Sequence, residues 1–132
     1  MANGFSLRLI EEGTLRATHD GFEFGIRLPW YRSLPLSTVE ISRLEVDGVA
    51  IDASALRLRL NDVNHAVTEL ANLTQEWWYV LDSAWLAVQY HASASDTRHE
   101  LALSLTLYPP YIPGLAWVTQ AKKTLHVSER SR

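Results

Sequence analysis

The stretch Phe22-Glu23-Phe24-Gly25-Ile26-Arg27-Leu28-Pro29-Trp30-Tyr31-Arg32-Ser33-Leu34-Pro35 decides the fold, because it runs from a strand pattern directly into a stiff loop. Across residues 22–28 an apolar side chain stands at every second position, which is typical of a strand with one buried face. Pro29 and Pro35 fix φ at about −65° and remove two backbone donors, so this part cannot be a helix interior or a central strand. We therefore expect a strand that delivers the chain into a rigid connector.

The same period-two alternation recurs along most of the chain and predicts further short strands. Besides 22–28, the predicted strands are residues 5–9, 39–46, 49–51, 56–60, 77–81, 85–90, 101–107, 115–118 and 124–127. Within 39–46 the apolar residues change parity after Ile41, so a β-bulge near Ser42 and Arg43 is needed to keep all of them inside. The strand at 101–107 has the most regular pattern of all.

Turn formers punctuate these strands and predict how they connect. Asp20-Gly21 and Asp47-Gly48 are tight-turn signals, and residues 61–64 predict a hairpin that returns through His65. A short helix competes there, because Val63, Ala66, Val67 and Leu70 have helical spacing. Residues 77–81 and 85–90 are expected to pair as a second hairpin around residues 82–84.

We expect about eight to nine of these segments to form strands, which predicts an all-β protein, an antiparallel β-sandwich. Residues 1–127 are expected to form one domain, followed by a polar C-terminal tail at 128–132. With 132 residues and 47% hydrophobic composition, the chain is long enough for one sizeable core.

Composition excludes several partner classes. Twelve Lys and Arg face 15 Asp and Glu, giving a formal net charge of −3 with no basic run, so neither nucleic acid nor a membrane is an expected partner. No apolar stretch is long enough to span a bilayer, and no secretory signal pattern opens the chain. Cysteine is absent, which excludes disulfides and fits a reducing compartment. We expect a cytoplasmic protein.

Catalytic and metal-binding patterns are missing from the sequence. The five histidines are scattered singly, without a spacing that presents two imidazoles to one metal, so no metal site and no catalytic residue is assigned. His99-Glu100 could be a base with an orienting carboxylate, but neighbours on a strand lie on opposite faces. Asp82 follows several aromatic residues and could accept a sugar hydroxyl, although an Asp that closes a turn is the more common reading. The candidates for sugar contact are Trp78, Asp82 and His99.

Two proline-rich loops carry the residue types that are enriched in protein interfaces. Trp30, Tyr31 and Arg32 stand in the first loop, and Tyr111 stands in the second, at residues 109–114. The alternative is that Trp30 and Tyr31 plug this domain's own core while Arg32 lies on the surface. The candidates for a subunit interface are Pro29, Trp30, Tyr31, Arg32, Ser33, Leu34, Pro35, Pro110 and Tyr111.

The chain resembles the small β subunit of bacterial C-glycoside deglycosidases over roughly residues 22–111. The motifs that carry this resemblance are Leu28-Pro29-Trp30-Tyr31-Arg32-Ser33-Leu34-Pro35-Leu36-Ser37, Val46-Asp47-Gly48, Trp77-Trp78-Tyr79-Val80-Leu81-Asp82, His99-Glu100 and Pro109-Pro110-Tyr111. The first motif is long and unusual enough to be fairly specific, whereas the others are short.

The resemblance implies a hetero-oligomer with a larger TIM-barrel α subunit, similar to sugar isomerases, which holds a divalent metal, manganese being the expected one, and a catalytic His. Such a complex cleaves the carbon–carbon bond between a 3-oxo sugar and an aromatic aglycone, because the oxo group acidifies the neighbouring sugar C–H and lets a base start an elimination. The present chain would be the accessory subunit, with no cofactor of its own.

Two other functions stay open at this point. The chain could be a stand-alone carbohydrate-binding module in which Trp77, Trp78 or Trp85 forms a stacking platform. It could also serve as accessory subunit of another sugar-isomerase-like enzyme. A sugar-isomerase-like reading frame beside this gene would favour a subunit role over a free-standing module.

Overall fold

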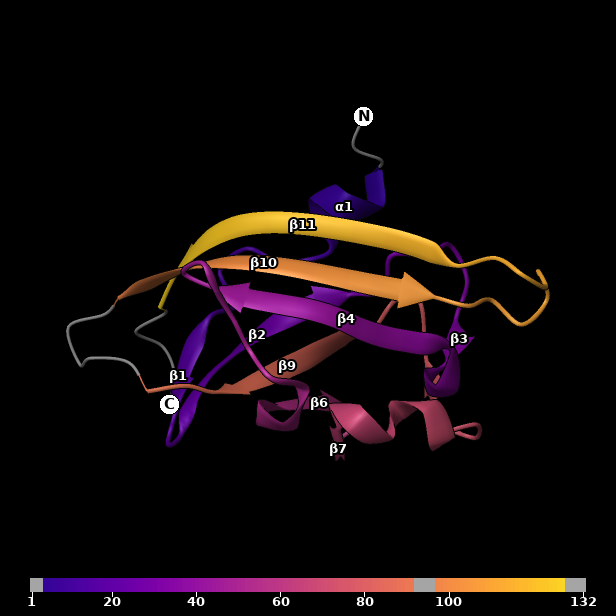
Figure 1. Cartoon of the computed structure of the whole chain (residues 1–132), viewed down its shortest axis with the longest axis horizontal. Helices are drawn as coiled ribbons and strands as arrows, with labels where there is room; N and C mark the ends of the chain where they lie inside the picture. The colour runs from indigo at the N-terminus through magenta and orange to yellow at the C-terminus, as the bar shows by residue number, and fades with distance from the viewer. Residues whose placement is uncertain (1–3, 92–96, 128–132) are drawn as a thin grey trace.

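Two antiparallel sheets packed face to face form the protein (Figure 1). The computed structural model describes residues 4–91 and 97–127, so the predicted tail at 128–132 lies outside the described residues. The five-stranded sheet contains, in spatial order, β1 (Arg16–Thr18), β2 (Gly21–Arg27), β9 (Ser83–Gln89), β6 (Leu56–Leu60) and β7 (Val63–Ala66). The four-stranded sheet contains β11 (Trp117–His126), β10 (Arg98–Leu107), β4 (Val39–Val46) and β5 (Val49–Ala50).

The predicted all-β sandwich is confirmed, and its core lies where alternation placed it. On β2 the side chains of Phe22, Phe24 and Ile26 face inward, and on β10 the leucines from Leu101 to Leu107 do the same from the other sheet. Burying one face of each sheet against the other removes this apolar surface from water and supplies most of the driving force for folding.

The predicted bulge in β4 is confirmed. Arg43 pairs with Ser104 and Ile41 pairs with Leu105, so Ser42 stands unpaired between them. The Ser42 hydroxyl shares a hydrogen bond of 2.7 Å with the Thr106 hydroxyl. The extra residue resets the parity, so that Ile41 and Leu44 both lie in the core.

The first predicted strand, at residues 5–9, is wrong. Residues there form the short helix α1 (Gly4–Arg8), with Leu9 fully buried and Leu7 69% exposed. Phe5 and Leu9 are four residues apart, so the same apolar pattern also fits one face of a helix. Lys123 of β11 holds the end of α1, because its Nζ donates to the Ile10 carbonyl oxygen at 2.9 Å.

The expected hairpin between residues 77–81 and 85–90 is also wrong. β8 (Trp77–Trp78) pairs instead with β3 (Leu34–Pro35) in a separate two-stranded sheet, while β9 lies between β2 and β6. The backbone of Asp82 closes a local turn, since its N–H donates to the Tyr79 carbonyl oxygen at 2.9 Å.

The other hairpins follow the turn signals. Asp47-Gly48 joins β4 to β5, and β6 pairs with β7 around Asn61 and Asp62, as predicted. The helical alternative is realised only after that hairpin, as the 3-10 helix η3 (Val67–Asn72). The remaining 3-10 turns are η1 (Leu36–Thr38) and η2 (Ala53–Ala55).

In place of the two short strands predicted at 115–118 and 124–127, the single long strand β11 spans Trp117–His126. The described residues therefore contain eleven strands, of which β1 and the two-residue β3 were not among the predicted ones.

Candidate functional site

The two proline-rich loops meet at one end of the sandwich. The loop between β2 and β3 carries Trp30, and the loop between β10 and β11 carries Tyr111. The indole Nε1 of Trp30 donates a hydrogen bond of 2.6 Å to the Tyr111 hydroxyl, although the two residues are 81 positions apart. The loops therefore form one rigid unit.

Trp30 fixes this unit to the body of the protein. It is only 7% exposed, and its ring packs against Phe5 of α1 at 6.4 Å and edge-on against Trp117 of β11 at 5.6 Å between centroids. A large aromatic side chain buried among other rings contributes both area and geometry to stability. Trp30 thus belongs to the protein's own core.

Tyr31 and Arg32, in contrast, lie on the surface beside Tyr111. Tyr31 is 60% exposed, and the Arg32 guanidinium lies 5.0 Å from the centre of the Tyr111 ring. The pKa of the Tyr31 phenol is raised above its usual 10.0, mainly by a hydrogen bond to Tyr111 and to a smaller extent by partial desolvation. Burial works to raise the pKa of the Tyr111 phenol, but hydrogen bonds from Trp30 and Tyr31 and the charge of Arg32 outweigh it and lower that pKa.

A third segment joins the same end of the molecule. The hydroxyl oxygen of Ser33 accepts a hydrogen bond of 2.8 Å from the backbone N–H of Val80, and Leu34 pairs with Trp78 across the two-stranded sheet. These contacts place the turn at residues 79–82 beside the first loop.

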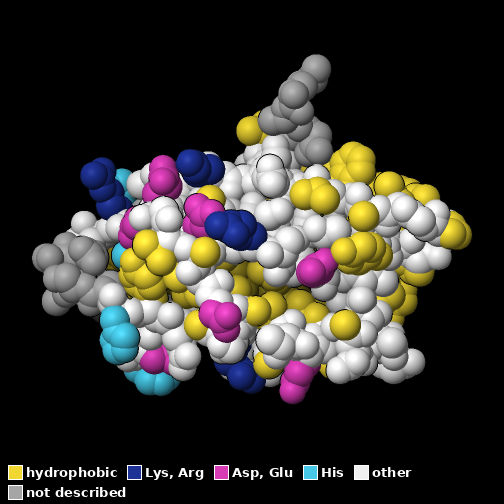
Figure 2. All heavy atoms as spheres, in the orientation of Figure 1, with side chains coloured by type: hydrophobic (Ala, Val, Ile, Leu, Met, Phe, Trp, Pro, Cys, Tyr) yellow, Lys and Arg dark blue, Asp and Glu magenta, His cyan; other side chains and the backbone are white. Residues whose placement is uncertain are grey.

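We call the resulting exposed patch the end surface. It consists of Tyr31, Arg32, Tyr79, Leu81, Tyr111 and Ile112. Leu81 is 81% exposed and Tyr79 is 54% exposed, which is unusual for apolar side chains on a small domain. Figure 2 shows hydrophobic side chains gathered at this end of the molecule, at the right of the view.

The structure divides the nine interface candidates. Tyr31, Arg32, Pro110 and Tyr111 are exposed, whereas Ser33 and Pro35 are half-buried and help to hold the loop. Pro29, Trp30 and Leu34 are buried in this chain's own core and can offer no contact to a partner, so their expected role is corrected.

The sugar-contact candidates also separate. Trp78 is fully buried, with its Nε1 donating to the Asp82 carbonyl oxygen at 2.9 Å. Its ring offers no face to a sugar, so the expectation for Trp78 is corrected. The sequence placed it in a regular strand, whereas the pairing of β8 with β3 turns it into the core.

His99 is likewise an interior residue, 3% exposed, which removes it from the sugar-contact candidates. Its ring stacks on Phe22 at 4.8 Å, and its Nδ1 lies 2.8 Å from a carboxylate oxygen of Asp47. Glu100 lies on the opposite, exposed face and is not its partner. Burial works against ionisation of Asp47, but hydrogen bonds from His99 and the Glu100 N–H outweigh it and lower the pKa of that carboxyl.

Asp82 lies in a small polar pocket that we call the β6–β9 pocket. It has a volume of about 220 Å³ and lies where the turn after β6 meets the start of β9. Its lining consists of Arg59, Leu60, Asn61, Asp62, Asp82, Ser83 and Trp85. Of these, only Asp82 and Trp85 were identified from the sequence, because the others look like ordinary strand and turn residues.

Trp85 is partly covered by charged side chains on the outer face of the five-stranded sheet. The Arg16 guanidinium lies 4.2 Å and that of Arg59 5.6 Å from the Trp85 ring centre. Both guanidiniums contact the Glu23 carboxylate, at 2.5 Å and 3.5 Å respectively. Trp77, 40% exposed, belongs to β8 in the separate two-stranded sheet, and its carbonyl oxygen accepts a hydrogen bond of 3.4 Å from the Asn61 side chain. The tryptophans therefore do not form one flat stacking platform.

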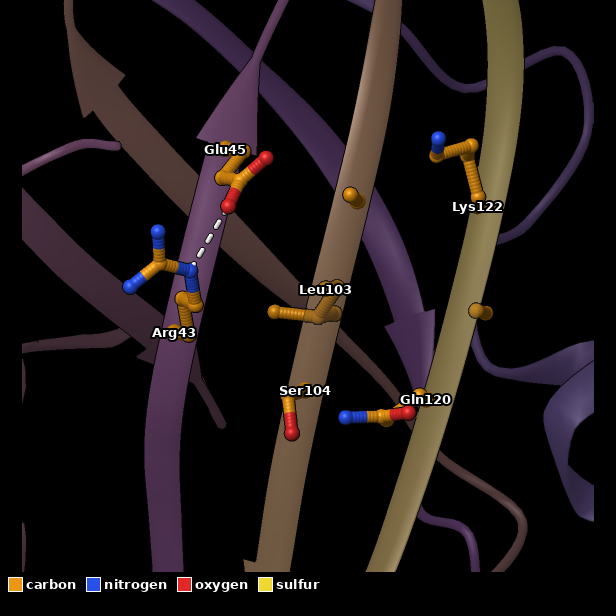
Figure 3. A pocket seen from close by; sticks show the side chains of 8 residues that line it. Arg43, Glu45, Leu103, Ser104, Gln120 and Lys122 are labelled. Atoms are coloured by element: carbon orange, nitrogen blue, oxygen red, sulfur yellow. Dashed lines mark hydrogen bonds and ion pairs between the residues drawn. The ribbon is translucent and has the colours of Figure 1, made fainter. Parts of the chain in front are cut away.

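A larger trough of about 450 Å³ crosses the outer face of the four-stranded sheet (Figure 3). Small residues of β10, among them Ser104, line its floor between longer side chains of β4 and β11. Arg43 and Glu45 are paired with each other at 2.7 Å. The trough contains no aromatic side chain and is open to solvent, so it offers little to hold a small ligand.

The described residues contain no group of three or more His, Cys, Asp or Glu side chains arranged to hold a metal ion. In residues 4–91 and 97–127, no helix is both long and apolar enough to cross a bilayer.

Comparison with known proteins gives a consistent family. The model of the C-glycoside deglycosidase beta subunit family matches residues 5–111. A C-glycoside deglycosidase beta subunit from Microbacterium trichothecenolyticum is 38% identical over 94% of this chain and 90% of its own length. A 3'-dehydrocarminate deglycosidase beta subunit from a Microbacterium species is 41% identical over 83% of this chain and 82% of its own. A C-glycoside deglycosidase beta subunit from Arthrobacter globiformis is 42% identical over 80% of each chain.

The matched region contains the first proline-rich loop, the second loop as far as Tyr111, and the turn at residues 79–82. With the family model covering most of the chain and relatives this similar over most of their own lengths, this chain belongs to the C-glycoside deglycosidase beta subunit family.

Proposed function

We propose that this chain is the accessory subunit of a hetero-oligomeric C-glycoside deglycosidase and that it binds a larger TIM-barrel subunit through the end surface. The complex cleaves the carbon–carbon bond between a 3-oxo sugar and an aromatic aglycone, a lyase reaction, in the cytoplasm. The names of the relatives, all beta subunits, support a role beside a second kind of subunit.

The observation that carries the proposal is the end surface itself. Tyr31, Arg32 and Tyr111 belong to the residue types that dominate binding energy in interfaces, and here they stand exposed on two loops tied together by the Trp30–Tyr111 hydrogen bond. Loops that are already rigid lose little conformational entropy on binding. The neighbouring turn adds Tyr79 and Leu81, which extends the apolar area.

The reaction itself is assigned to the partner. The proton to be removed stands beside the 3-oxo group of the sugar, so the chemistry needs a base, and a divalent metal, proposed to be manganese, would supply polarisation of the oxo group. His99 is buried against Phe22 and bonded to Asp47, which suits a structural role. The donor groups of the described residues form no cluster that fits a metal centre, so the proposal places the metal in the larger subunit.

The test is to express this chain with and without the product of a neighbouring sugar-isomerase-like reading frame. The co-expressed proteins should purify together and release the aglycone from a 3-oxo C-glycoside, whereas this chain alone should give no turnover. The barrel protein expressed alone is the control for chemistry that needs no accessory subunit. Turnover by the isolated small chain, or a barrel protein that never co-purifies with it, would contradict the proposal.

A further inference from the structure

The β6–β9 pocket has a lining that is built and held in place by contacts on the protein. Residues 61 and 62 form a two-residue turn between the paired Leu60 and Val63. Asn61 and Asp62 have φ values of 54° and 63°, the left-handed conformation that such a hairpin turn requires. On the other side, the backbone of Asp82 is fixed by its N–H bond to the Tyr79 carbonyl and by the Trp78 indole.

Two carboxylates in this lining share the pocket with the Arg59 guanidinium, which is paired with Glu23 rather than with either of them. Among the described residues, neither Asp62 nor Asp82 forms an ion pair, and no side-chain hydrogen bond occupies either carboxylate. Each carboxylate therefore offers free acceptor positions in a pocket of about 220 Å³. A few convergent polar groups in a concave site can fix the orientation of a bound small molecule.

Arg59 and Trp85 supply the complementary chemistry. One guanidinium nitrogen of Arg59 contacts Glu23 at 3.5 Å, and the guanidinium lies 5.6 Å from the Trp85 ring, so the side chain is held while other N–H donors stay open. The Trp85 indole, which the Arg16 guanidinium partly covers at 4.2 Å, adds an apolar surface beside Ser83. The lining thus combines acceptors, donors and an aromatic ring.

We propose that the β6–β9 pocket binds the sugar ring of a glycoside. A neutral polyol can donate to both carboxylates, accept from Arg59 and place C–H groups against the indole. A divalent cation is disfavoured by the Arg59 guanidinium in the lining, and a phosphate is disfavoured by the two carboxylates. The volume is below the roughly 300–1,000 Å³ of pockets for drug-sized ligands, so one sugar ring fills it and the aglycone lies outside.

The identity of the sugar as part of a C-glycoside rests on the proposed function, but the binding does not. Asp82 lines the pocket while its chain neighbour Leu81 belongs to the end surface. A glycoside held in the pocket would therefore project its aglycone beside the surface at which the partner docks.

The test is a titration of the isotope-labelled chain with methyl β-D-glucopyranoside, followed by amide chemical shifts. Amides of residues 59–62 and 82–85 should shift and saturate at millimolar sugar. Asp62→Asn and Asp82→Asn should each weaken binding about tenfold, because each replaces a charged acceptor by a neutral one. Asn tolerates the left-handed backbone of residue 62, so the fold is preserved.

Asp20→Asn is the matched control, since it makes the same change in a turn far from the pocket. The β2–β9 ladder runs from the Arg27–Ser83 pair beside the pocket to the Gly21–Gln89 pair beside Asp20. It should bind the sugar as the wild type does. No saturable shift in the wild type, equal losses in all three variants, or saturation by calcium but not by sugar would overturn the proposal. Assembly with the barrel protein is measured separately. Loss of sugar binding with intact assembly would contradict only this inference. Sugar binding without assembly would contradict only the proposed function.

Discussion

Tyr111 connects three kinds of contact at a single side chain. Its hydroxyl oxygen accepts from Trp30, its phenol is hydrogen-bonded to Tyr31, and Arg32 lies over its ring. Loss of any one neighbour therefore changes the others. At this scale, the important distinction is between Trp30, which is buried in the core, and Arg32, which is exposed and which we propose contacts the partner.

Arg32→Ala should weaken assembly with the larger subunit by about 2 kcal/mol or more, because the group that Arg32 meets there would be left buried and unpaired. The free energy of unfolding of the isolated chain should change by no more than about 0.5 kcal/mol, since Arg32 is exposed and contacts between exposed side chains add little to stability. Calorimetric titration against the larger subunit and thermal melts of the lone chain measure the two quantities.

Trp30→Ala is the matched variant with the opposite pattern. It removes a ring that is 7% exposed, so unfolding should become easier by about 3 kcal/mol or more. If Arg32→Ala instead lowered the melting temperature strongly and left the assembly affinity unchanged, the loop would serve only this domain's own core.

The Asp47 carboxylate should make the free energy of unfolding depend on pH. Its pKa is lowered from 3.8 in the folded state, so the stabilisation is complete above the unfolded-state pKa and is lost as pH falls through the lower folded value. Asp47→Asn should therefore be less stable than the wild type at neutral pH, with the difference shrinking below about pH 4. Urea midpoints across this range measure it, and a difference that stays constant with pH would refute the assignment.

At the scale of elements, the pairing of strands β2 and β9 leaves no room for a side chain at one position, Gly21. A Cβ added at Gly21 would lie 1.9 Å from the backbone oxygen of Val88 on β9, whereas at Gly25 the nearest atom, at 2.7 Å, is the flexible Glu11 carboxylate. Backbone cannot retreat as a side-chain tip can, so the two glycines of one strand have different tolerances.

Gly21→Ala should destabilise the protein by about 3 kcal/mol, because β2 and β9 must separate at that point. Gly25→Ala is the control and should cost clearly less. Chemical denaturation of both variants measures the difference, and equal losses would show that the close approach at Gly21 has no special weight.

Regular elements with one buried face could be predicted from the sequence, whereas the pairing of the short strands β3 and β8 could not. Alternation identified β2, β6 and β10, and the parity change located the bulge at Ser42. The partner of β8 depends on contacts between Leu34 and Trp78, 44 positions apart, which no local pattern reports. For α1, an apolar spacing of four fitted strand and helix alike until its burial was known.

The candidate site was predictable to a similar extent. Composition singled out the two proline-rich loops, but their meeting through Trp30 and Tyr111 is a tertiary contact. The β6–β9 pocket went unnoticed except at Asp82 and Trp85, because Arg59 and Asp62 acquire a role only when the hairpin turn stands beside the start of β9.

At the scale of the whole molecule, one prediction follows from the distribution of donor groups. The isolated chain, incubated with manganese and then dialysed, should retain far less than one ion per molecule, because it has no cysteine and the described residues contain no clustered ligands. Elemental analysis measures the ratio, with the co-purified complex as the comparison. A tightly held ion on the small chain alone would show that our proposal assigns the metal to the wrong subunit.

The turn at residues 79–82 takes part in two surfaces, with Leu81 in the end surface and Asp82 in the β6–β9 pocket. Under both proposals, sugar and partner bind to neighbouring residues of one turn, and their binding equilibria form a closed thermodynamic cycle. The factor by which a bound sugar changes the affinity for the partner must then equal the factor by which the partner changes the affinity for the sugar. The supply of glycoside would in that case help to set how many small subunits are engaged at any moment, without a separate regulator.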